Sequence, residues 1–184
     1  MRGVPDHALH DVPGCTRRAA PSHEAGWVVV TRTSIDLIDR RARDADTRGE
    51  RPIELHLDSP GGPLGACLVL FDAADTLRSE LRVLCRGQVG GAVVAIVSAA
   101  DHRAATPHTR FHLSQPTARF TGTPEEIAAQ SQQQQELLWR LYGRLARRTG
   151  RPAEEIAEDM RRGRYLDAYE ALAYGLIDEI TAGG

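Results

Sequence analysis

The sequence predicts a single α/β domain built on parallel strands, because a strand, turn and helix unit occurs twice in succession. In the first unit, Ile53, Leu55 and Leu57 alternate with polar residues, which is strand periodicity, and residues 59–62 (Ser-Pro-Gly-Gly) end the strand. In the second unit, an apolar strand over residues 81–85 precedes a glycine-rich turn. Two such units in a row imply parallel strands joined by right-handed crossovers.

Composition limits the class of protein. The 184 residues fit one domain, and 23 basic against 25 acidic residues leave a net charge of -2. Without a basic excess, nucleic acid is not expected as the main partner. No apolar run is long enough to span a bilayer and the N-terminus lacks a signal pattern, so we expect no membrane partner. Cys67 and Cys85 lie in apolar stretches and are expected to be buried free thiols, which suits a reducing cytoplasm.

The first part of the chain is predicted to be irregular. Residues 1–25 hold three prolines and few large apolar side chains, which predicts a flexible N-terminal arm. The β-branched run from Trp27 to Thr31 predicts a buried strand, and a brief helical face follows and ends near Arg43. The folded domain is therefore expected to occupy residues 26–184.

Further elements are expected between the first glycine turn and Leu113. Apolar residues at helical spacing predict a helix from Leu64 to Leu77. Residues 87–91 are expected to form the second turn. Residues 92–100 predict a helix that is apolar all round and therefore buried. A pair of strands is expected on either side of Pro107.

A long helix is predicted over residues of about 124–148. Thr123 can cap it, Pro124 suits its first position, and Glu126 completes a capping box, while Gly150 ends it. Its first half is polar and its second half carries one apolar face. A helix of this length cannot lie wholly on a domain of this size, so part of it is expected to project. A second capping box at Asp167 opens a shorter helix, and a last strand is expected within residues 176–180.

The two glycine turns are the candidate site. They follow adjacent parallel strands, and ligands in such folds bind at the carboxyl ends of strands. Glycine lets a substrate backbone approach closely and lets free amides point at an oxyanion. The alternative interpretation is that both are ordinary strand-to-helix turns. Spacing alone leaves both interpretations open.

Several motifs in a fixed order resemble the proteolytic subunit of the Clp protease, ClpP. The resemblance covers most of the chain, from about Trp27 to Ile180, and rests on Leu57-Asp58-Ser59-Pro60-Gly61-Gly62, Gly87-Gln88, Gln115-Pro116, Arg164-Tyr165-Leu166 and Tyr174-Gly175-Leu176-Ile177-Asp178. It implies a crotonase-like fold of stacked βαβ units. It also implies that the long helix is a handle that joins two rings, commonly of seven subunits each. The implied partners are copies of the same chain or an active ClpP paralogue, and a Clp ATPase unfoldase.

All three positions of the catalytic triad depart from the family pattern. The resemblance places the nucleophilic serine at Gly91, the general-base histidine at Ser114 and the aspartate at Gly163. Glycine has no side chain to attack with, and a serine hydroxyl is no base near neutral pH. Ser98 lies too deep in its helix to replace the nucleophile, and Ser59 is expected to satisfy its own turn. The sequence therefore predicts a subunit without peptidase activity.

The oxyanion hole is expected to survive, because it consists of backbone amides. The resemblance places it at Gly61, Gly62 and Ala92, where an extended peptide would bind without being cut. His112, two residues before Ser114 and so about 6–7 Å away on the same face of its strand, is the candidate displaced base. No cofactor and no metal ion are expected.

Three hypotheses of function follow. The first is a peptidase-inactive ClpP-like protein that acts as a structural or regulatory ring subunit. The second is an enzyme that uses the oxyanion hole without a serine nucleophile, in crotonase-like thioester chemistry, with His112 or Asp58 as acid or base. The third is a weak serine-type peptidase with a site rearranged around His112.

Overall fold

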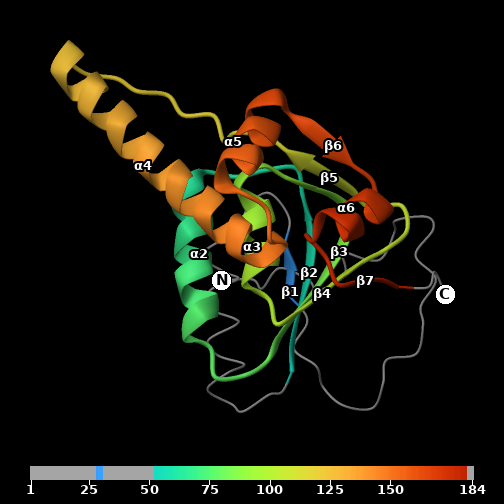
Figure 1. Cartoon of the computed structure of the whole chain (residues 1–184). Coiled ribbons are helices and arrows are strands. Elements are labelled where there is room, and N and C mark those ends of the chain that lie inside the picture. The colour runs from blue at the N-terminus through green and yellow to red at the C-terminus, as the bar shows by residue number, and fades with distance from the viewer. Residues whose placement is uncertain (1–27, 31–51, 182–184) are drawn as a thin grey trace, which may run out of the picture.

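The computed structural model describes residues 28–30 and 52–181 (Figure 1). The predicted arm over residues 1–25 and the brief helix that ends near Arg43 lie outside the described residues. The elements in chain order are β1 (Val28–Val30), β2 (Ile53–Ser59), α2 (Leu64–Thr76), β3 (Leu81–Gly90), a 3-10 turn (Gly91–Val93), α3 (Val94–Ala99), β4 (His102–Ala105), β5 (Arg110–Leu113), α4 (Pro124–Thr149), α5 (Ala153–Arg162), β6 (Arg164–Leu166), α6 (Ala168–Tyr174) and β7 (Glu179–Ile180).

The described strands form one sheet whose main path runs β1-β2-β3-β4-β7, and every pair along it is parallel. The strand β3 has different neighbours at its two ends. Its first half pairs with β4, while Gln88 to Gly90 pair in parallel with β5. The short strand β6 then pairs antiparallel with β5. The predicted α/β fold with successive parallel βαβ units is confirmed.

The second glycine turn was placed wrongly by the sequence. Strand β3 continues through residues 87–90, and only Gly91 begins the turn. Position 90 requires glycine, because a Cβ there would lie 2.5 Å from the carbonyl oxygen of Pro60, so no larger residue fits. A glycine-rich sequence is usually a turn signal, but here the missing side chain allows two backbone segments to approach closely.

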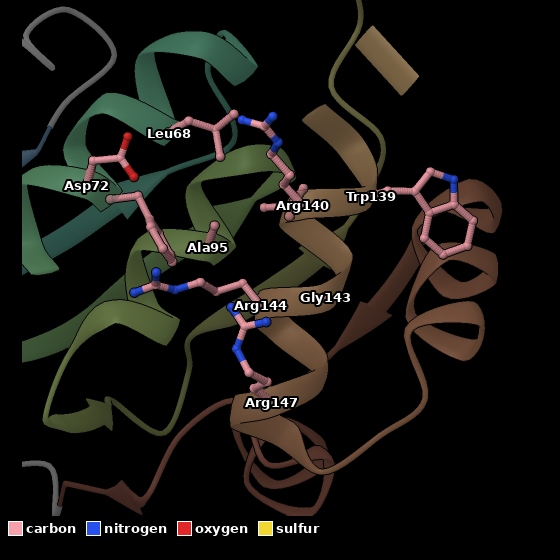
Figure 2. Close-up of a pocket in the computed structure, with 10 residues that line it drawn as sticks. Leu68, Asp72, Ala95, Trp139, Arg140, Gly143, Arg144 and Arg147 are labelled. Atoms are coloured by element: carbon pink, nitrogen blue, oxygen red, sulfur yellow. The ribbon is translucent and has the colours of Figure 1, made fainter. Parts of the chain in front are cut away.

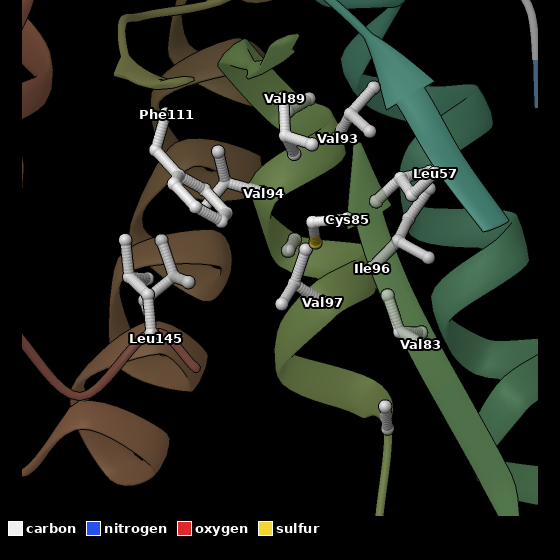
Figure 3. Close-up of a cluster of buried hydrophobic side chains, with 14 of the residues drawn as sticks. Leu57, Val83, Cys85, Val89, Val93, Val94, Ile96, Val97, Phe111 and Leu145 are labelled. Carbon is white, nitrogen blue, oxygen red and sulfur yellow. The ribbon is translucent and has the colours of Figure 1, made fainter. Parts of the chain in front are cut away.

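The core lies between the sheet and a layer formed by α2, α3 and the second half of α4 (Figure 1). Figure 2 shows how the arginines of α4 extend toward α2, and there the Arg144 guanidinium lies 3.5 Å from the centre of the Phe71 ring and pairs with Asp75. Figure 3 shows α3 between Val83 and Cys85 of the sheet on one side and Leu145 of α4 on the other. The prediction that this helix is buried on all sides is confirmed, as is the burial of Cys67 and Cys85 as free thiols.

The long helix α4 begins and ends as its sequence predicts. The Glu126 amide donates to Thr123 Oγ1 at 3.3 Å and the Thr123 amide donates to Glu126 Oε2 at 2.8 Å, while Gly150 adopts the left-handed conformation that ends a helix. Its buried residues, Leu141, Tyr142 and Leu145, all lie in the second half. At 1.5 Å per residue its 26 residues span about 39 Å. The first half projects from the body of the protein (Figure 1).

The C-terminal segment is joined to the sheet by a buried arginine. Arg103 of β4 is only 7% exposed, and its guanidinium donates to the Gly175 carbonyl at 2.8 Å and to the Leu176 carbonyl at 3.2 Å. It also forms an ion pair with Asp178, whose carboxylate in addition accepts the Arg103 backbone amide at 2.9 Å. The Arg103 hydrogen bonds lower the pKa of Asp178 below its usual value. Helix α5, which precedes this segment, was not predicted from the sequence.

Candidate functional site

The candidate site is a cavity of about 570 Å³ at the carboxyl end of β2, lined by both glycine segments. Its walls come from three places: the turn after β2, the start of the turn after β3, and the segment that leaves β5. The lining residues are Pro60, Gly61, Gly62, Pro63, Gly91, Ser114, Gln115, Pro116 and Thr117. Four positions singled out by the sequence, Gly61, Gly62, Gly91 and Ser114, thus lie around one space.

Position 91 is close enough to Ser114 that a side chain there would contact it. A Cβ added to Gly91 would lie 3.8 Å from Ser114 Oγ and 3.5 Å from the Gly61 Cα. These are ordinary van der Waals distances, so the site has room for a side chain at position 91. Gly91 has a φ of +55°, however, and this conformation is strained for residues other than glycine.

Gly163 lies beside the end of β5 at the C-terminus of α5. In the antiparallel register of β5 and β6, Leu113 is opposite Arg164, so the next pair in that register would be Ser114 and Gly163. Gly163 has a φ of +70°, the left-handed conformation of a helix end. Position 91 is thus close to Ser114, whereas the atom that lies within 4 Å of a Cβ at Gly163 belongs to His112.

His112 lies next to Gly163 and does not line the cavity. Its imidazole stacks on the Tyr165 ring with centroids 4.0 Å apart and an angle of 3° between the planes. Its Nε2 lies 3.4 Å from the Cβ that a side chain at Gly163 would have. Among the described residues, the three atoms nearest a Cβ at Gly91 belong to Gly61 and Ser114. His112 is thus near Gly163, the position predicted for the acid, and the Ser114 hydroxyl is near Gly91, the position predicted for the nucleophile.

The predicted oxyanion-hole residues divide into two groups. Gly61 and Gly62 line the cavity, whereas Ala92 is fully buried within the 3-10 turn directly after Gly91. The hydroxyl of Ser59 donates to the Gly61 carbonyl at 3.1 Å, so it stabilises its own turn as expected. The cavity is thus lined by backbone from two glycine segments with few side chains between them.

The remaining acidic and hydroxyl candidates have structural roles. The carboxylate of Asp58 accepts a hydrogen bond from the backbone amide of Gln88 at 3.1 Å and so links β2 to β3. The Asp159 carboxylate pairs with Arg164 at 3.1 Å and accepts the Tyr174 hydroxyl at 2.9 Å. The Ser98 hydroxyl, which is buried, donates to the Ala95 carbonyl at 2.6 Å. None of these contacts presents a nucleophile to the cavity.

One link between the cavity and α4 was not predicted. Gln115, which lines the cavity, donates from its side-chain amide to the Tyr142 hydroxyl at 3.0 Å. Burial raises the pKa of Tyr142 above its usual value. No local signal in the sequence indicates this pair, because its members are 27 residues apart and only the packing of α4 brings them together.

The described part of the chain has no group of three or more His, Cys, Asp and Glu side chains arranged to hold a metal ion. In the same residues, no helix has both the length and the apolar character needed to cross a membrane.

Comparison with known protein families identifies the family to which this fold belongs. A family model described as Clp protease matches residues 44–183. The chain belongs to the Clp protease family. The match includes both glycine segments, the long helix α4 and the C-terminal segment that Arg103 holds. Members of the Clp protease family form oligomeric rings.

The fold is that of the Clp protease family, and the positions that the resemblance assigns to its catalytic groups can be located in it. A nucleophile, a base and an acid are needed, each within hydrogen-bond reach of the next. The positions that the resemblance predicts for these three groups hold Gly91, Ser114 and Gly163. Ser114 is the lining residue of the cavity that carries a hydroxyl closest to Gly91.

Proposed function

We propose that this member of the Clp protease family has no peptidase activity and acts as a structural or regulatory subunit of a ring. The observation that supports the proposal most strongly is the arrangement of Gly91, Ser114 and Gly163. A Cβ at Gly91 would lie 3.8 Å from Ser114 Oγ and one at Gly163 would lie 3.4 Å from His112 Nε2, but neither glycine carries a side chain that could act as nucleophile or acid. Loss of a triad leaves roughly 10³–10⁴-fold acceleration over water, far below the 10⁶-fold or more of ordinary enzymes.

The retained scaffold supports a role in assembly. Helix α4 keeps its capping box and its full length, although its first half contributes no buried residue to this chain. A partner chain packed against this projecting half would cover the apolar side chains that the chain alone leaves exposed. We propose that the partners are copies of the same chain or an active paralogue in rings of seven, with a Clp ATPase unfoldase as a further candidate, in the cytoplasm.

The cavity itself supports a role in binding without cleavage. An extended peptide could lie along Gly61 and Gly62, where no side chain blocks the approach of its backbone. Such a subunit would hold or select peptides and leave their hydrolysis to an active neighbour in the same ring.

Labelling with a fluorophosphonate probe tests the proposal. The purified chain should remain unlabelled after hours at a probe concentration that fully labels an active serine peptidase. Labelling at a stoichiometry near one per chain would show that a nucleophile is present and would overturn the proposal. Stabilisation of the chain against heat by an acyl-CoA, and not by peptides, would instead support thioester chemistry.

A further inference from the structure

The last ten residues of α4 carry more positive charge than their place in the helix requires. Residues 140–149 contain no acidic residue and include four arginines, Arg140, Arg144, Arg147 and Arg148. The helix dipole favours basic residues in the last turn, which accounts for Arg147 and Arg148. Arg144 forms an ion pair with Asp75. Arg140 has neither explanation, because it lies more than two turns before the end of the helix.

Three of these arginines line a cavity of about 340 Å³ between α2 and α4, here called the arginine cavity (Figure 2). Arg140, Arg144 and Arg147 are four and three residues apart, so they share one face of the helix. The facing wall comes from α2 and α3 and includes Leu68, Phe71, Asp72 and Ala95. The volume lies within the range of pockets that hold small molecules.

Positive charge is in excess in this cavity. Within the described part of the chain, neither Arg140 nor Arg147 forms an ion pair. Asp72 is the acidic residue of the lining. Even when Asp75 beside Arg144 is counted with it, three guanidinium groups face two carboxylates. The cavity therefore attracts an anion, and its apolar wall provides a surface for an organic group.

A glycine in the middle of α4 is a second, independent observation. Gly143 lines the arginine cavity, although glycine is the least favourable residue in a helix interior after proline. Its φ is not positive. A Cβ there would have one neighbour within 4 Å outside its own helix backbone, Arg147 Nη1 at 4.0 Å. Neither conformation nor packing thus requires glycine at this position, and its effect is to leave open the space between Arg140 and Arg147.

We propose that the arginine cavity binds a small organic anion, whose phosphate or carboxylate group is held by Arg140 and Arg147 and whose apolar part lies against Leu68. Arginine has paired N–H donors that match both kinds of oxyanion. Both arginines are exposed and have long side chains, so each can turn toward a ligand that lies over Gly143. Such a ligand would connect α2 to α4 and so stabilise the folded chain.

This site goes beyond the proposed function and does not depend on it. The arginine cavity and the cavity lined by the glycine segments have no lining residue in common. None of Gly91, Ser114 and Gly163, the positions predicted for the triad, lines the arginine cavity. A ligand bound there would act on the chain through its helices and not through the positions predicted for catalysis.

Binding is measured on the full-length chain by isothermal titration calorimetry and by thermal unfolding, at low salt and without other multivalent anions. The probes are phenyl phosphate, benzoate and inorganic phosphate. We expect one site per chain and about tenfold tighter binding of phenyl phosphate than of inorganic phosphate, because the ring buries apolar surface. Tighter binding of phenyl phosphate than of benzoate would assign the site to phosphates, and the reverse to carboxylates. Absence of binding and of thermal stabilisation with all three probes at millimolar concentration would overturn the proposal.

Charge variants locate the site. Arg140→Gln with Arg147→Gln should weaken binding by at least about tenfold, because hydrogen bonds from charged donors are lost. The matched control is Arg110→Gln with Arg119→Gln, at exposed arginines outside the cavity, and it should change the affinity by less than about twofold because distant charges are screened. Asp72→Asn removes a repulsive charge and should tighten binding by about two- to threefold. Equal affinity of the two arginine variants would refute the assignment.

A variant that fills the cavity separates binding from stability. Gly143→Leu keeps every charge and favours the helix, so the chain should be at least as stable in urea while phenyl phosphate binding is lost. The control Gly65→Leu changes a glycine of α2 that has nothing within 4 Å and does not line the cavity, and it should keep the affinity of the wild type. A folded Gly143→Leu chain, checked by circular dichroism, that binds like the wild type would place the ligand elsewhere and refute the proposal. Fluorophosphonate labelling is independent of all these outcomes, so failure here leaves the proposed function intact.

Discussion

Restoring the triad is the sharpest test of the geometry described above. The variant Gly91→Ser with Ser114→His and Gly163→Asp places a nucleophile, a base and an acid on the three positions that the family resemblance predicts for the triad. The structure has room for the change, because a Cβ at Gly91 would have no neighbour nearer than 3.5 Å and one at Gly163 no neighbour nearer than 3.4 Å. The neighbour at Gly163 is His112, which can hydrogen-bond to the new carboxylate.

The cost of the change is set by the backbone. The left-handed conformation costs about 1–2 kcal/mol for an ordinary residue. Two positions with φ near +55° and +70° are affected, and aspartate tolerates this conformation better than serine. The triple variant should therefore be less stable than the wild type by about 2–3 kcal/mol. That loss leaves a domain of typical stability folded.

Activity is measured as hydrolysis of a fluorogenic peptide and as fluorophosphonate labelling. The control variant carries Gly91→Ala in place of Gly91→Ser, which has the same backbone strain without the hydroxyl. The triple variant should exceed this control by at least about 10²-fold, because general-base catalysis alone contributes about 10²–10⁴-fold. A folded triple variant that is neither labelled nor active would refute the convergence of the three positions. Peptide hydrolysis by the wild type would refute the predicted inactivity.

Three further predictions concern the scaffold. Gly90→Ala should lower the free energy of unfolding, measured in urea, by about 1–3 kcal/mol, because its Cβ would meet the Pro60 carbonyl at 2.5 Å. The control Gly65→Ala, whose Cβ would have nothing within 4 Å, should raise the free energy of unfolding by about 0.5–1 kcal/mol in the same assay. Arg103→Met should cost about 3 kcal/mol in the same assay, since it leaves two carbonyls without their donor and Asp178 without its guanidinium partner, and no loss would refute its role. Burial, with the charge of Arg86, lowers the pKa of His56 to about 4, so His56 is neutral in the folded chain and protonates on unfolding below pH 6.5. Stability should therefore fall by up to about 3 kcal/mol between pH 6.5 and 4, and the fall should be smaller in His56→Gln when both are measured by thermal unfolding across that range.

The sequence predicted those parts of the fold that depend on local signals. The capping boxes at Thr123 and Asp167 fix where α4 and α6 begin, and both are present in the structure. The alternation of Ile53, Leu55 and Leu57 likewise predicted β2 correctly. Each of these signals lies within a few residues of the feature that it specifies.

Features that depend on distant contacts were missed. Strand β3 continues past Cys85 because β5 offers a second neighbour and Pro60 requires glycine at position 90, and neither fact is visible within residues 81–91. His112 was expected to face the cavity because of its spacing from Ser114, but the ring of Tyr165 holds it beside Gly163. Sequence spacing specifies the face of a strand, while the rotamer depends on the neighbouring strand.

The Arg103 contacts also determine when the fold can be completed during synthesis. Residues 179 and 180 of β7 cover the edge of β4, and Asp178 and the carbonyls of Gly175 and Leu176 reach Arg103 from more than 70 residues away. Until residues 175–180 have left the ribosome, this edge of β4 has no strand of the described sheet beside it. An open edge of this kind can pair with another chain. Strand β7 therefore covers an edge of the growing chain that could otherwise pair with another chain.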